Sequence, residues 1–108
     1  MGVSRKKPLW SSLDVDVLTS ETKDIDSVLL SAFKGSIFVI TATGNGLTKN
    51  LTLQSSKNNS SVSDMVYNRW GDSLSITFDF ISSGGNAFIR STNSESFTIN
   101  LSIKKLTF

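Results

Sequence analysis

The sequence predicts an all-β protein built as an antiparallel β-sandwich. From residue 25 onward, apolar and polar residues alternate with a period of two, as they do in strands that bury one face. Serine, threonine and asparagine are abundant, and their side chains suit half-buried strands and tight turns. Glutamate, a strong helix former, occurs only at Glu21 and Glu95, which argues against a long solvated helix.

Length and composition limit the chain to one small domain and exclude several kinds of chemistry. The chain has 108 residues, the size of a single domain. It contains no histidine and no cysteine, so zinc fingers, thiol catalysis, serine–histidine–aspartate triads and disulfides are excluded. The net charge of +2 is too small to favour nucleic acid, and no apolar run is long enough to span a bilayer. We therefore predict no enzymatic activity, no cofactor, no bound metal, no nucleic acid and no membrane association.

The N-terminal part of the chain differs in composition from the rest. A basic run precedes the only proline, Pro8, and an acidic, alternating stretch follows at residues 13–18. Two interpretations are open: a frayed terminus with one edge strand, or an extended arm that docks on a neighbouring subunit through an exposed tryptophan. The expected division is an N-terminal arm or edge strand, 1–24, and a single β-sandwich domain, 25–108. The candidate anchor residues of the arm are Arg5, Lys6, Lys7, Leu9 and Trp10.

The middle of the chain predicts several strands and one tight turn. In chain order, the expected elements are a strand or one short helical turn at 25–33, strands at 36–43 and 50–54, a polar loop at 55–61 and a strand at 62–70. Residues 36–43 are apolar or β-branched on both faces, which is typical of a central strand. The run Gly44-Asn45-Gly46 tolerates positive φ and predicts the turn that follows this strand.

The last strands are the clearest, because their alternation is strict. Residues 74–80 and 97–103 each place four large apolar side chains on one face, and a short strand at 87–90 lies between them. Turn signals every 8 to 12 residues then predict about seven to eight strands in a jelly-roll or immunoglobulin-like sandwich. The residues expected to supply most of the core are Ile37, Val39, Leu53, Leu74, Ile76, Phe78, Phe80, Phe97, Ile99 and Leu101.

Two pairs of carboxylates are candidates for metal binding or acid–base chemistry. A period of two places Asp14 and Asp16 on one strand face, and it also places Asp24 and Asp26 on one face. A calcium site needs several more oxygen ligands converging in a loop, and the sequence shows none. We interpret the four carboxylates as charges that discourage edge strands from pairing with other chains.

Residues 65–72 are the segment richest in side chains that are typical of binding sites. Aromatic rings stack on the C–H bonds of sugars, and tryptophan, tyrosine and arginine also supply most of the binding energy at protein interfaces. Three interpretations stay open: a glycan site, a subunit interface, and ordinary core beside a turn. The candidate contact residues are Tyr67, Arg69, Trp70 and Asp72.

The stretch Gly35 to Phe108, about two-thirds of the chain, resembles the small β-sandwich modules of virion proteins of tailed bacteriophages. Such modules occur in head fibres, capsid decoration (cement) proteins and tail fibres. The resemblance lies in the order of a strand at 33–40, Leu51-Thr52-Leu53, Val66-Tyr67, a strand at 74–80, the turn Gly84-Gly85-Asn86 into 87–89, and a closing strand at 98–101. The chain lacks the collagen-like or coiled-coil stalk that precedes many fibre modules, which favours a compact decoration or head-fibre protein.

The resemblance implies a structural protein of the virion, made in the host cytoplasm, that binds the particle surface and stabilises or ornaments it. The implied partner is the major capsid protein or another virion protein, and the implied state is a homo-oligomer, with a trimer favoured. Small size supports association independently, because a thin sandwich exposes sheet edges that a symmetric contact covers. The alternative is a tail-associated fibre or receptor-binding module that contacts a host surface glycan through Tyr67 and Trp70.

Overall fold

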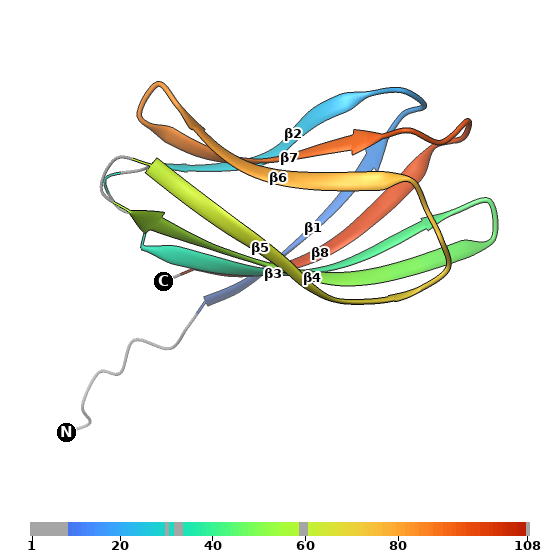
Figure 1. The fold of residues 1–108 in the computed structure, drawn as a ribbon, viewed down its shortest axis with the longest axis horizontal. Coiled ribbons are helices and arrows are strands. Elements are labelled where there is room, and N and C mark those ends of the chain that lie inside the picture. Colours follow the sequence, from blue (N-terminus) through green and yellow to red (C-terminus); the bar gives the residue numbers. More distant parts are fainter. Residues whose placement is uncertain (1–8, 30, 32–33, 59–60, 108) are drawn as a thin grey trace.

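Eight strands in two antiparallel sheets make up the part of the chain that the structure describes. The structure, a computed structural model, describes the backbone of residues 9–29, 31, 34–58 and 61–107, and the side chains of 11–27, 31, 34–56 and 69–106. The strands are β1 Leu9–Val17, β2 Thr22–Leu29, β3 Gly35–Gly44, β4 Leu47–Asn58, β5 Ser61–Gly71, β6 Ile76–Ser83, β7 Asn86–Asn93 and β8 Ile99–Thr107. A five-stranded sheet of order β1-β8-β3-β4-β5 stacks on a three-stranded sheet of order β2-β7-β6 (Figure 1). The predicted all-β sandwich is therefore confirmed.

The strand order shows which kind of sandwich this is. In the five-stranded sheet β1 pairs with β8, and in the three-stranded sheet β2 pairs with β7. This nesting of the first strand with the last is found in jelly rolls. In an immunoglobulin-like sandwich the first two strands pair with each other, whereas here they lie in different sheets. The outer pairs thus follow the jelly-roll pattern, and the meander β3-β4-β5 and the hairpin β6-β7 complete the two sheets.

In the described residues the sandwich already includes Leu9–Val17, within the expected N-terminal segment 1–24. β1 is an edge strand of the five-stranded sheet, paired with β8 along its whole length, and β2 is an edge strand of the three-stranded sheet. Of the two interpretations of the N-terminal part, the structure has the edge strand for Leu9–Val17. Residues 1–8, which include the basic run, lie outside the described residues. In the described residues, no helix is long and apolar enough to cross a membrane.

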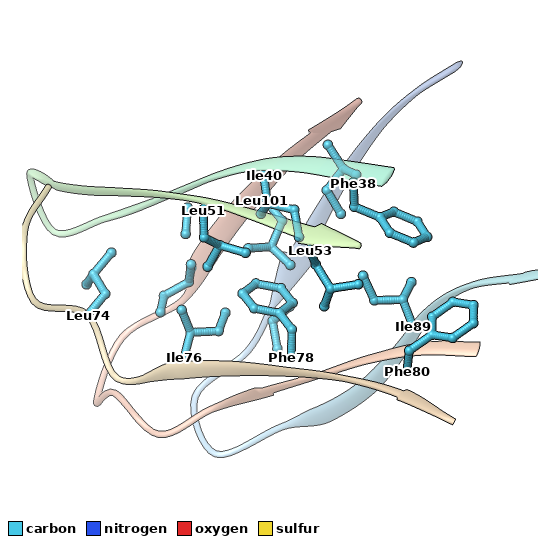
Figure 2. Close-up of a cluster of buried hydrophobic side chains, with 14 of the residues drawn as sticks. Phe38, Ile40, Leu51, Leu53, Leu74, Ile76, Phe78, Phe80, Ile89 and Leu101 are labelled. Atoms are coloured by element: carbon cyan, nitrogen blue, oxygen red, sulfur yellow. The ribbon is translucent and has the colours of Figure 1, made fainter. Parts of the chain in front are cut away.

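The core lies between the two sheets and is built from alternate residues of their facing strands (Figure 2). Phe38 on β3 and Phe80 on β6 meet across the two layers, with ring centroids 6.0 Å apart and planes tilted by 46°. Seven predicted core residues are buried, which confirms that part of the prediction: Leu53, Leu74, Ile76, Phe78, Phe80, Ile99 and Leu101.

β3 turns the opposite face toward the core from the one that we predicted. Val39 is 40% exposed and Ile37 is half-buried, whereas Phe38 and Ile40 are buried. The strand is apolar on both faces, so its own sequence does not decide which face turns inward. Its pairing with β4 decides, because it sets Ile40 opposite the buried Leu51, and directly paired residues share a face.

Two other expectations need correction. The polar stretch at 55–61 is strand over most of its length, because β4 continues to Asn58 and β5 begins at Ser61. Ser55 is buried there, and its hydroxyl hydrogen bonds to that of Ser36 at 2.8 Å, which satisfies both groups inside the sandwich. Phe97 precedes β8 and is only partly buried against the core.

Candidate functional site

The outer face of the five-stranded sheet brings together residues that the sequence presents as separate candidates. Its Cα register aligns the strands in cross-strand rows, and alternate rows belong to the core side and the solvent side. Row 1 is Trp10, Leu106, Ile37, Gln54 and Met65; row 2 is Ser12, Lys104, Val39, Thr52 and Tyr67; row 3 is Asp14, Ser102, Thr41, Asn50 and Trp70; row 4 is Asp16, Asn100, Thr43 and Thr48. We call these four solvent-side rows the outer face.

Rows 1 and 2 are rich in apolar and aromatic residues. Ile37 is half-buried, Val39 is exposed, and Leu106 is 9% exposed although it lies on the outer face. Trp10 on β1 and Tyr67 on β5 occupy the opposite ends of these two rows by register, and their side chains lie outside the described residues. Among the described side chains of these rows, Val39 and Ile37 are the apolar ones that solvent reaches, and neighbouring apolar side chains on the outside of a small protein can mark a contact surface.

The apolar part of this face was missed in the sequence analysis, although a signal for it was present. We interpreted residues 36–43 as a central strand of the sandwich with Ile37 and Val39 in the core. In a two-layer sandwich every strand has only one face toward the core. A strand with Ile37 and Val39 on one face and Phe38 and Ile40 on the other must therefore carry one apolar face outside.

Trp70 is the exposed aromatic residue of the predicted contact segment. Its side chain is 57% exposed in row 3, opposite Asn50, so for this residue the core interpretation is wrong. Next to it, Arg69 is exposed, where β5 carries an extra residue relative to β4. The guanidinium lies close enough to Lys49 to affect that amine: burial lowers the pKa of Lys49 most, and the charge of Arg69 lowers it further.

Asp72 is bonded to the backbone of the neighbouring strand. Its N–H donates to the carbonyl of Thr48 at 2.7 Å, and its Oδ2 accepts from the N–H of Thr48 at 2.9 Å. Gly71 precedes it with φ of +107°, and a Cβ there would lie 2.5 Å from the Thr48 oxygen, so only glycine fits. Asp72, expected as a contact residue, thus closes the end of β5 beside Trp70.

Asp14 and Asp16 share the outer face, as predicted. Both are exposed on the edge strand β1, in rows 3 and 4. The side-chain amide of Asn100 on β8 donates to Oδ1 of Asp16 at 3.0 Å. The pair gives the β1 edge of the outer face a negative charge.

The prediction that Asp24 and Asp26 share a face is wrong. β2 contains an extra residue at this point, so Asp24 lies opposite Arg90 and Asp26 lies opposite the buried Ile89. Asp24 accepts a hydrogen bond of 2.7 Å from the Arg90 guanidinium, which holds the pKa of that carboxyl below its usual value. Asp26 instead pairs with Lys105 of the other sheet, so each carboxylate has its own cation.

The chemistry of the outer face is that of non-covalent contact. It offers apolar side chains, an exposed indole, hydroxyls, amides, two carboxylates and the exposed amine of Lys104. In the part of the chain that the structure describes, no three acidic, histidine or cysteine side chains are placed to hold a metal ion. No protein-family model and no curated protein matches the sequence. The outer face itself is therefore the guide to function.

Proposed function

We propose that this protein is a structural protein of a bacteriophage virion, a capsid decoration, cement or head-fibre protein that works by assembly and is not an enzyme. The observation that carries the proposal is the outer face of β3, where Val39 is 40% exposed and Ile37 is half-buried, both outside the core cluster. Small folded proteins rarely leave such residues together unless a partner covers them. The resemblance of Gly35–Phe108 to virion β-sandwich modules supplies the kind of assembly.

Attachment to the particle is assigned to the basic run that precedes β1. Arg5, Lys6 and Lys7 offer three positive charges to acidic groups on the major capsid protein or another virion protein. Trp10, expected as part of the same arm, has a backbone that pairs with Leu106 within the sheet. We therefore assign Trp10 to the outer face, and the basic run alone to attachment.

Replacing Arg5, Lys6 and Lys7 with serine tests this attachment without shortening β1. Each exposed ion pair contributes about 1 kcal/mol or less, so the triple variant should bind particles up to about 100-fold more weakly. The measurement is co-sedimentation with particles that lack the protein, together with occupancy by cryo-electron microscopy. Lys34→Ser, which removes an exposed charge elsewhere, is the matched control and should bind as the original protein does. Full occupancy by the triple variant would show that the basic run is not the anchor, and failure of the original protein to bind particles would reject the virion assignment.

A second candidate function, recognition of a host surface glycan, is favoured by the exposure of Trp70. Its indole lies in row 3 with Asn50, whose Oδ1 accepts a hydrogen bond of 2.9 Å from the Thr41 hydroxyl. An exposed ring beside amide and hydroxyl groups is a surface on which a sugar ring can stack while its hydroxyls are bonded.

Tryptophan fluorescence separates this candidate from the structural role. The chain has two tryptophans, so Trp10→Phe leaves Trp70 as the only reporter, and Trp70→Phe leaves Trp10. If row 3 binds a glycan, a saccharide from a panel of host surface sugars should quench Trp10→Phe and leave Trp70→Phe unchanged. Absence of quenching in Trp10→Phe across the panel would remove the glycan candidate.

A further inference from the structure

We infer that the outer face binds a second copy of this chain, the two five-stranded sheets stacking face to face around a two-fold axis that runs along β3. The inference rests on the proposed function, because it names the partner of the surface that carries that proposal. β3 is the central strand of the sheet, with β1 and β8 on one side of it and β4 and β5 on the other. With an axis along β3, strands β1 and β8 of one copy therefore lie over β5 and β4 of the other copy.

The area of the outer face fits a reversible dimer. Five strands at about 4.8 Å and four rows at about 6.8 Å cover about 600 Å² in each copy. Stacking two copies would bury about 1,200 Å² in total, the lower end of the range for specific interfaces. The face is therefore large enough for a specific contact, and association should depend on concentration.

The position of the apolar residues selects the axis along β3. That axis keeps every row opposite the same row of the second copy, so Ile37 faces Ile37 and Val39 faces Val39. An axis across the strands at the centre of the face would set apolar row 1 against polar row 4, which contains Asp16 and Asn100. Moving that axis toward row 1 would match the apolar rows but leave half of the face uncovered.

The charged side chains of the outer face are compatible with the same axis. Asp14 and Asp16 are exposed on β1 in rows 3 and 4. An axis along β3 places Asp14 opposite Trp70 of the second copy, because both residues lie in row 3. Lys104 on β8 then faces the uncharged Thr52 of the second copy.

A face that matches itself in this way produces a closed two-fold dimer. The second copy covers the whole outer face, so a third chain cannot bind to the same surface. The dimer therefore takes the place of the trimer that the family resemblance implies, and the basic run of each copy stays available for attachment.

Val39→Asp is the decisive variant, because Val39 lies beside the axis and meets its own copy. We expect the mass of the original protein to rise from one chain toward two with concentration in sedimentation velocity. Val39→Asp should stay at the mass of one chain over the same range, since two carboxylates would meet at the centre of the contact. Thr77→Asp adds the same charge at an exposed position of the three-stranded sheet and should associate as the original protein does. Circular dichroism of both variants confirms that each is folded.

Cross-linking tests the geometry. Because the chain contains no cysteine, Val39→Cys introduces a single thiol. Facing sheets lie about 10 Å apart, too far for a direct disulfide, so the reagent is a short bis-maleimide. Val39→Cys should be captured at the mass of two chains, and Thr77→Cys should not.

An original protein that stays at one chain at every concentration would overturn the inference, and so would association of Val39→Asp or equal capture of Thr77→Cys. These outcomes are distinguishable from failure of the proposed function. If the protein stays a monomer in solution but occupies particles, the structural role is supported and the dimer is rejected. If it forms a dimer but binds no particle, the dimer contact is supported and the virion assignment is rejected.

Discussion

Asn93→Ala is expected to lower the free energy of unfolding by about 3–5 kcal/mol, although it removes only a small polar side chain. The side chain of Asn93 is fully buried at the end of β7. Its amide donates to the carbonyls of Val17 and Phe97, both at 2.9 Å, and its Oδ1 accepts from the N–H of Glu95 at 2.8 Å. It thereby joins the end of β1 to the segment that leads into β8. Alanine would leave these three backbone groups without their partner in or beside the core.

The measurement is urea unfolding of the variant and of the original protein, followed by circular dichroism. Asn100→Ala is the matched control, because its amide bonds the exposed Asp16 and should contribute about 1 kcal/mol or less. Equal losses of stability in the two variants would contradict the role of Asn93 as a buried junction.

Ile40→Ala is expected to cost about 2–5 kcal/mol, whereas Val39→Ala, one residue away, should cost about 1 kcal/mol or less. Ile40 is fully buried between the sheets and faces β6 and β7 across the core, so alanine leaves a cavity there (Figure 2). Val39 points to the outer face, where it is 40% exposed. Chemical denaturation of the two variants at low protein concentration measures the difference directly. A larger loss for Val39→Ala than for Ile40→Ala would mean that β3 has the opposite face inward.

The second half of the chain shows how far alternation alone can predict this fold. Residues 74–80 carry large apolar side chains on one face only, so a single arrangement buries them, and all four are buried. The turn at Asn45-Gly46 was equally predictable, because its φ angles of +51° and +76° suit asparagine and glycine. In such segments the alternation within one strand is enough to predict which of its faces is buried.

The candidate site was predictable residue by residue, but its assembly was not. Trp10 and Tyr67 were both singled out, yet as parts of an arm and of a separate aromatic segment. They lie in adjacent rows of one face only because β8 inserts between β1 and β3, a pairing of strands from opposite ends of the chain. Asp72 was taken for a contact residue because its bond to the Thr48 backbone depends on where β5 ends against β4.

The amino-acid sequence is enough to predict an all-β sandwich, the buried face of residues 74–80 and the absence of histidine and cysteine chemistry. The folded chain was needed to find which face of β3 turns inward, that an extra residue in β2 separates Asp24 from Asp26, and that Asn93 is a buried junction. The difference lies in what a strand's own alternation can specify. A strand with one apolar face carries its orientation in its own alternation, whereas a strand that is apolar on both faces or carries a bulge takes its orientation from cross-strand partners.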